Sequence, residues 1–188
     1  MKDKATFFKN LSIVIVVALM GVLLIASYFI PIMGASEHSR VSSYSCRDVV
    51  VAMKAEKQED LYTTSIQEAH SCISENEGKA GQLIRVVGVL GMINAMIGAA
   101  ILICAVATVF LKYNILRIAA LAFAIAALAV SIAMIVMLCS YLGIVTESTH
   151  PYAFYYSISA ASFVMLGASL FSGAGSWFLG FFDKEETK

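Results

Sequence analysis

Two cysteines, Cys46 and Cys72, lie in the most charged stretch of this 188-residue chain. A turn is expected near residues 59–63, midway between them, so an antiparallel helical hairpin would bring the two sulfurs together. Outside the cytoplasm such a pair is most simply a disulfide, which would stabilise the hairpin by about 3 kcal/mol. We therefore expect a Cys46–Cys72 disulfide. Reduced thiols, a bond to a partner and a thiol–disulfide oxidoreductase are the alternatives, although the chain has no Cys-x-x-Cys.

The three histidines could bind a metal ion. His38, His70 and His150 each lie near a glutamate in the sequence. A zinc or copper site needs three or four ligands that converge at about 2 Å, and no short ligand motif is present. Solvated histidines are the favoured interpretation, so we expect no metal and no cofactor, with these three residues as weak metal-ligand candidates.

Three polar side chains stand inside long apolar stretches: Asn94, Thr108 and Ser131. A buried asparagine usually donates a hydrogen bond to a neighbouring helix, a contact worth about 0.6 kcal/mol and sometimes up to about 2 kcal/mol. The alternative is that these residues, together with the serines of the fourth helix, line the path of a small transporter or channel for an uncharged or lipid-like solute. No nucleophile with a neighbouring base, phosphate loop or carboxylate pair accompanies them, which argues against an enzyme.

The elements that must position these residues are apolar helices. Four stretches, residues 11–33, 86–111, 115–144 and 152–182, are apolar and nearly free of charge, and each exceeds the roughly 20 residues that cross a bilayer. The sequence therefore predicts an all-α integral membrane protein, a four-transmembrane-helix bundle with a small helical extracytoplasmic hairpin at residues 34–85. The first stretch could instead be a signal peptide, but it is longer than the usual apolar region of 7–15 residues.

Charge sets the predicted orientation. Residues 1–10, the turn at residues 112–117 and the tail at residues 183–188 carry seven Lys or Arg against four Asp or Glu. The hairpin and the short loop at residues 145–151 carry six against nine. By the positive-inside rule, both termini and the turn at residues 112–114 are cytoplasmic, in a cell membrane, and residues 34–85 are extracytoplasmic.

Small residues repeat along three of the predicted helices, at spacings of three and four that place them on one face. Such faces let helices approach closely in lipid. We expect them to pack within the bundle, with the second and third helices as a tight antiparallel pair and the first helix more exposed to lipid. The alternative is that one face, most readily on the fourth helix, docks another subunit. The packing candidates are Gly91, Ala95, Gly98, Ala122, Ala126, Ala129, Ala133, Gly173 and Gly180.

The extracytoplasmic segment is predicted to contain two helices. Ser45 can cap the first, with Asp48 in its first turn and Cys46 and Val49 on its apolar face. The second is expected to begin at the possible capping box Ser65–Glu68. About 50 residues suffice for a small domain, so this hairpin is the expected recognition surface.

Four spans with a long first outer loop resemble the claudin and myelin-protein group in outline. The loop lacks that group's tryptophan and closely spaced cysteines and has helical periodicity, so no family is assigned. The sequence favours a non-enzymatic protein-binding or assembly subunit. Its expected partners are membrane lipids and other membrane or extracytoplasmic proteins, or a second copy in a homo-oligomer, and no nucleic acid.

Overall fold

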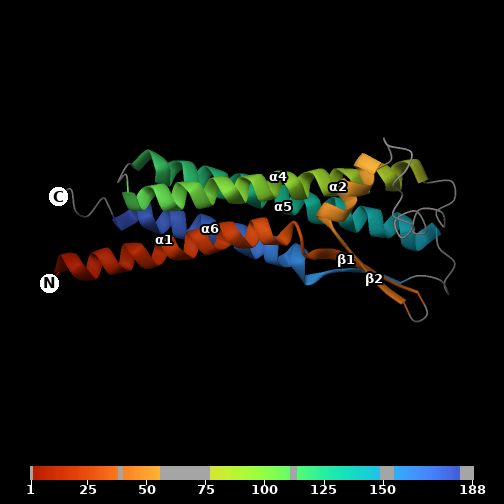
Figure 1. Cartoon of the computed structure of the whole chain (residues 1–188), viewed down its shortest axis with the longest axis horizontal. Helices are drawn as coiled ribbons and strands as arrows, with labels where there is room; N and C mark the ends of the chain where they lie inside the picture. Colours follow the sequence, from red (N-terminus) through yellow and green to blue (C-terminus); the bar gives the residue numbers. More distant parts are fainter. Residues whose placement is uncertain (1, 38–39, 56–76, 111–113, 149–154, 183–188) are drawn as a thin grey trace. The chain divides into compact units, whose positions relative to one another are not determined.

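The computed structural model describes residues 2–37, 40–55, 77–110, 114–148 and 155–182, and these are mostly helical (Figure 1). The elements in chain order are α1 (Lys2–Ser27), β1 (Pro31–Glu37), β2 (Arg40–Ser45), α2 (Cys46–Ala55), α4 (Glu77–Phe110), α5 (Asn114–Ser148), β3 (Tyr155–Ile158) and α6 (Ala160–Phe182).

Within the described ranges, four helices are long and apolar enough to cross a membrane, as the sequence predicts. The candidate spans are Asn10–Ser27 in α1, Gly81–Phe110 in α4, Ile115–Ile144 in α5 and Ala161–Phe178 in α6. At 1.5 Å per residue, even the 18-residue spans of α1 and α6 are about 27 Å long. That length is close to the roughly 30 Å of a hydrocarbon core.

Helix α1 ends earlier and α6 begins later than predicted, because extended segments adjoin them at those ends. Helix α1 ends at Ser27, and β1 begins at Pro31 rather than continuing the helix to residue 33. Proline disfavours helical backbone at the residue before it and lacks the N–H that a helix interior needs. At the other end, the β-favouring residues Tyr155–Ile158 form β3, so α6 begins at Ala160 instead of residue 152.

These strands form an antiparallel sheet in the order β2-β1-β3, which corrects the all-α prediction. Strand β1 pairs with β2 from Pro31↔Ser45 to Glu37↔Arg40, with an irregularity between Pro31 and Met33. It also pairs with β3 from Met33↔Ile158 to Ser36↔Tyr155. The segment after α1 and the segment before α6 therefore belong to one sheet, a long-range pairing that local helical periodicity cannot reveal.

The predicted capped helix is present as α2. The backbone N–H of Ser45 donates to Asp48 Oδ2 at 2.8 Å, and the Asp48 N–H donates to Ser45 Oγ at 3.3 Å. This reciprocal arrangement satisfies N–H groups that a helix start leaves without partners. The Cys46 and Val49 side chains are buried on the predicted apolar face. The second predicted helix of the hairpin lies outside the described residues. Residues 145–148, predicted as an outer loop, continue α5 to Ser148, and residues 149–151 lie outside the described residues.

The chain divides into two compact units. Unit 1 comprises Met1–Ala26, Asn94–Ser131 and Val164–Lys188, and unit 2 comprises Ser27–Ile93 and Ile132–Phe163. Unit 2 contains the sheet and α2, which we call the platform.

In unit 1 each of the four helices contacts two others. Gly21 of α1 faces Gly98 of α4, and Val17 of α1 contacts Gly175 of α6. Asn94 of α4 is hydrogen-bonded to Ser131 of α5, and Ser131 lies 3.2 Å from Ser169 of α6. Red α1 and blue α6 run side by side in Figure 1. Unit 1 is thus a closed four-helix arrangement.

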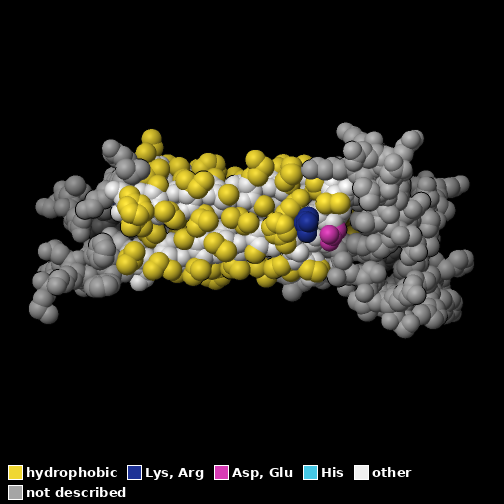
Figure 2. Space-filling model, viewed as in Figure 1, with side chains coloured by type: hydrophobic (Ala, Val, Ile, Leu, Met, Phe, Trp, Pro, Cys, Tyr) yellow, Lys and Arg dark blue, Asp and Glu magenta, His cyan; other side chains and the backbone are white. Residues whose placement is uncertain are grey.

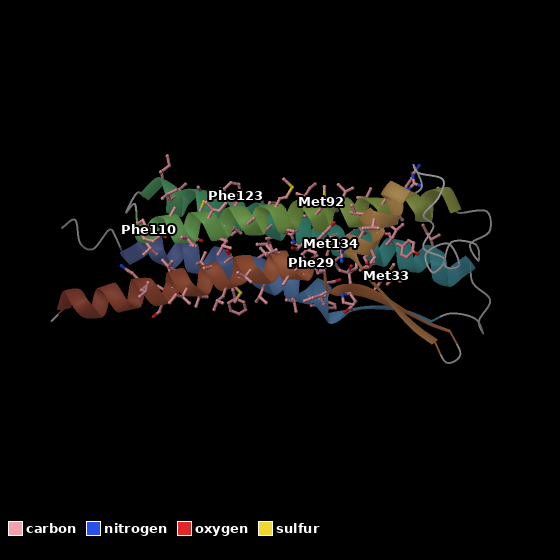
Figure 3. All side chains as sticks on the ribbon, viewed as in Figure 1. Phe29, Met33, Met92, Phe110, Phe123 and Met134 are labelled. Atoms are coloured by element: carbon pink, nitrogen blue, oxygen red, sulfur yellow. The ribbon has the colours of Figure 1, made fainter. Side chains whose placement is uncertain are left out.

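Large apolar side chains cover the outside of the helices. Phe110, Ile103 and Met96 are about two-thirds exposed or more, whereas Met134 is fully buried (Figure 3). On the face drawn in Figure 2, hydrophobic side chains extend along the described helices and charged groups gather at one place. Soluble monomers rarely expose so much continuous apolar surface. The surface suits a hydrocarbon environment.

Candidate functional site

A buried polar network links three helices of unit 1. Asn94 Nδ2 donates to Ser131 Oγ at 3.0 Å, and Ser131 Oγ lies 3.2 Å from Ser169 Oγ. Ser169 Oγ donates to the carbonyl oxygen of Met165 in its own helix at 2.8 Å. Asn94 and Ser131 are fully buried and Ser169 almost so. The structure therefore brings together two of the three polar residues that the sequence singles out, and adds Ser169.

The third, Thr108, is buried and donates to the carbonyl oxygen of Ala105 one turn earlier at 2.6 Å. A hydroxyl satisfied by its own helix needs no partner on another helix. No described hydrogen bond joins Thr108 to the Asn94 network.

The buried face of α6 carries more hydroxyl groups than expected. Ser162, Ser169, Ser172 and Ser176 are all buried. Sequence reasoning places Ser169 and Ser176 on a small-residue stripe and considers the serines of this helix together as a possible solute lining, but it does not single out these four as one buried face. Their separations of seven, three and four residues are the signal that they share a helix face.

Helix packing in unit 1 depends on Gly98. A Cβ atom built on Gly98 would lie 2.7 Å from Leu24 Cβ and 2.9 Å from the Gly21 carbonyl oxygen. The small residues of α4 therefore admit α1, which buries Val17 and Leu24 on this side. Leu19 and Val16 of α1 are exposed, in keeping with a helix whose other side faces lipid.

The remaining packing candidates of α4 and α6 are placed differently. Ala95 is half-buried on α4. On α6, Gly173 is half-buried, and a Cβ there would meet only Ala124 Cβ, at 3.7 Å. The surroundings of Gly180 lie outside the described residues.

The predicted alanine stripe of α5 faces outward. Ala122 and Ala129 are exposed, and Ala126 and Ala133 are half-buried. The buried face of α5 is formed by another set, namely Ala120, Ala124, Ala127, Ser131, Met134 and Leu138. The expectation that Ala122 and Ala129 pack within the chain is therefore corrected, because both are exposed. Periodicity groups residues on one helix face but does not tell which face points inward when both are apolar.

The Cys46 thiol is free and buried against α4 in unit 2. A Cβ on Gly91 would overlap Cys46 Sγ and lie 2.6 Å from Cys46 Cβ, and a Cβ on Gly88 would lie 2.8 Å from Val49 Cγ1. Two glycines of the predicted α4 stripe therefore accommodate α2. Burial, followed by the nearby Asp48 carboxylate, raises the pKa of Cys46 to about 12.

The expected Cys46–Cys72 disulfide is not found. Cys46 is a free thiol whose sulfur lies against Gly91, and Cys72 lies outside the described residues. The physical reason is that α2 packs its cysteine-bearing face on α4, which buries the Cys46 sulfur against Gly91.

Aromatic residues surround the end of α1. The rings of Tyr28 and Phe29 form an edge-to-face pair with centroids 5.2 Å apart, and the Arg47 guanidinium lies 5.9 Å from the Phe29 centroid. The Arg47 N–H donates to the Tyr28 carbonyl oxygen at 3.2 Å. Burial, assisted by the charges on Cys46 and Asp48, raises the pKa of Tyr28, although Arg47 opposes the shift. These contacts fasten the start of α2 to the end of α1.

The histidines cannot be placed in a site, because His38, His70 and His150 lie outside the described residues. Within the ranges that the structure describes, no group of three or more His, Cys, Asp or Glu could hold a metal ion.

Comparisons of the chain with protein-family models, with curated proteins and with solved structures returned no match. The arrangement of the described residues is therefore the basis on which a function can be proposed.

Proposed function

We propose that this chain is a non-enzymatic integral membrane protein that crosses the membrane four times, with both termini in the cytoplasm. It acts as an assembly subunit that binds other membrane or extracytoplasmic proteins. The platform is its recognition surface, and membrane lipid surrounds its helices.

The observation that carries this proposal is the preorganisation of the platform. The Ile32 carbonyl oxygen, next to the irregularity in β1, accepts hydrogen bonds from Ser159 N–H at 2.8 Å and Ser162 Oγ at 3.3 Å. On the other side, α2 fits against Gly88 and Gly91 of α4. A surface fixed before binding loses less conformational entropy on association. A simple connector between spans would need neither the sheet nor the close α2–α4 contact.

The exposed stripe of α5 is a second feature that supports assembly. Ala122, Ala129 and Ser140 follow one face of this helix and are exposed. Small residues permit close backbone approach between helices in lipid. A helix that meets only lipid has no need of them on its outer face.

The buried Cys46 argues against the alternative of a thiol–disulfide oxidoreductase. Thiol exchange requires an accessible thiolate. Cys46 is fully buried, and its pKa of about 12 leaves almost no thiolate at neutral pH.

Site-specific photocrosslinking in intact cells tests the proposal. A photoreactive amino acid is placed at Val51, the exposed apolar residue of α2, and in a second variant at Ala129 of α5. Met96 of α4, which is 66% exposed, is the lipid-facing control. We expect adducts of discrete mass from Val51 and Ala129 that Met96 does not give. Equal crosslinking to lipid alone from all three positions would refute assembly through these surfaces.

Passage of a small uncharged solute is a second candidate, favoured by the convergence of Asn94, Ser131 and Ser169 inside unit 1. Its test is flux into vesicles that contain the purified protein, compared with the Asn94→Leu variant. A path along these residues predicts a loss of flux in the variant while its circular dichroism spectrum is kept. Unchanged flux would exclude that path.

A further inference from the structure

Several buried polar atoms of unit 1 have no hydrogen-bond partner among the described residues. Asn94 Oδ1, Ser172 Oγ and Ser176 Oγ are inaccessible to solvent and have no hydrogen-bond partner among the described residues. All three side chains are at least 97% buried. More than 90% of buried polar groups in proteins do have a partner, which is often an ordered water molecule. Asn10 Oδ1 in unit 1 is also without a described partner, but Asn10 is only half-buried, so the three atoms on fully buried side chains are the ones that require an explanation.

The hydrogen-bond directions in the network leave Asn94 Oδ1 without a donor. A serine hydroxyl has one hydrogen, and that of Ser169 is used by the Met165 carbonyl oxygen. The 3.2 Å contact between Ser131 and Ser169 must then use the hydrogen of Ser131. Ser131 accepts from Asn94 Nδ2, so no hydroxyl in the network can turn toward Asn94 Oδ1. What is missing is a hydrogen-bond donor.

The two unpartnered serines lack the bond that usually satisfies a helical hydroxyl. Ser169 and Thr108 both donate to a carbonyl oxygen of their own helix, but Ser172 and Ser176 do not. They lie on the same face of α6 as Ser169, and the seven residues from Ser169 to Ser176 span about 10 Å.

The side chains next to this face are small. Gly173 adjoins Ser172, and a Cβ built on it would meet only Ala124 Cβ, at the ordinary distance of 3.7 Å. By contrast, a Cβ on Gly98 or Gly175 would overlap a neighbouring helix. There is therefore room for a Cβ atom beside Ser172, at Gly173, where there is none at Gly98 or Gly175.

We propose that ordered water molecules occupy the interior of unit 1, held by Asn94 Oδ1 and by the hydroxyls of Ser172 and Ser176. Water supplies the donor that Asn94 lacks and can accept from or donate to both serines. An ion is disfavoured because residues 94–110, 118–131 and 164–178 contain no Asp, Glu, Lys, Arg or His. This inference does not depend on the proposed assembly function.

Radiolytic labelling of the intact protein in detergent tests the proposal directly. Hydroxyl radicals generated from bound water oxidise nearby side chains even when bulk solvent cannot reach them. Met165 and Met134 are both fully buried and lie one turn from Ser169 and from Ser131, so both flank the network, whereas the buried Met33 belongs to β1 of unit 2 and serves as the control. We expect Met165 and Met134 to be oxidised at least about tenfold faster than Met33. Equal protection of all three methionines would overturn the proposal.

Alanine substitutions give a second, independent readout. If water satisfies the hydroxyls, Ser172→Ala and Ser176→Ala remove its partners, and the unfolding equilibrium constant rises about fivefold or more. If the hydroxyls are buried dry, alanine removes an unpaired polar group and that constant falls. Ser140→Ala is the control, since Ser140 is exposed and donates to the Val136 carbonyl oxygen. A neutral or stabilising effect at both positions contradicts the proposal.

Discussion

Replacing Gly91 by alanine tests whether α2 and α4 fit together as described. Gly91 has no side chain where Cys46 presents its sulfur, and a Cβ there would lie 2.6 Å from Cys46 Cβ. Ordinary contacts between such atoms are 3.4–4 Å, so α2 would have to move away by about 1 Å. Overpacking of this kind costs about 1–3 kcal/mol.

The intrinsic preference of a helix for alanine acts in the opposite direction and must be subtracted. Alanine is favoured over glycine inside a helix by about 0.8–1 kcal/mol. Gly81→Ala in the same helix is the matched control, because no atom lies within 4 Å of a Cβ built there. The difference between the two variants isolates the clash. We expect Gly91→Ala to be less stable than Gly81→Ala by about 1–3 kcal/mol, or about 2–10 °C in melting temperature for a chain of this size.

A graded rescue connects the effect to Cys46. In the Gly91→Ala background, Cys46→Ala removes the sulfur but keeps the Cβ, so it should restore part of the stability. Cys46→Gly removes both atoms and should restore more. The assay is thermal unfolding followed by circular dichroism in one detergent. If Gly91→Ala matches Gly81→Ala, or if neither cysteine substitution rescues it, α2 does not pack on α4 as described.

Four further predictions concern three side chains, Cys46, Ser131 and Ser45. Because burial raises the pKa of Cys46 from 9.0 to about 12, its alkylation at pH 8 should be about a thousandfold slower in the folded than in the unfolded protein; comparable rates contradict this. Because the folded state holds the thiol proton more tightly than the unfolded state, the contribution of Cys46 to the free energy of unfolding is fully present below pH 9 and is lost as pH rises from 9 to about 12. Cys46→Ala should abolish this pH dependence in a titration of stability. Ser131→Ala removes the acceptor of Asn94 and should cost about 0.6–2 kcal/mol in detergent unfolding, with no cost expected for the exposed Ser140→Ala. Ser45→Ala removes the cap of α2 and should cost about 1 kcal/mol; no loss of α2 helicity or stability would argue against the cap.

The apolar spans were predictable because hydropathy depends only on local composition. The predicted boundaries 86–111 and 115–144 lie close to the candidate spans of α4 and α5. The ends at residues 33 and 152 were not predictable in this way. Met33–Ser36 pairs with Tyr155–Ile158 across more than 100 residues, and no local pattern encodes such a pairing.

The polar residues of the candidate site could be predicted from the sequence, but which face of each helix points inward could not. Asn94 and Ser131 stand out because polar residues are rare in apolar helices. The alanines of α5 form an evident stripe, yet lipid and protein interior are both apolar, so the pattern cannot distinguish the outward Ala122 from the inward Ala124. The predicted Cys46–Cys72 disulfide is wrong because Cys46 packs against Gly91 of α4, a contact that the spacing of the two cysteines does not encode.

The sheet also changes the comparison with the claudin and myelin-protein group. A helical first loop is one of three differences predicted from the sequence, and it holds only for α2, because β1 and β2 precede that helix. The missing tryptophan and the wide spacing of Cys46 and Cys72 remain. No membership follows from the shared outline.

The most direct test of assembly is the mass of the particle that this protein forms in its own membrane. The membrane is solubilised with a copolymer that keeps the surrounding lipid, and the particle is purified through a tag on the C-terminus. Its protein mass is then measured by native mass spectrometry. Assembly through the platform and α5 predicts a protein mass above that of one chain, reduced to one chain by bulky substitutions at Val51 and Ala129. A single chain in every particle of the unsubstituted protein would contradict it.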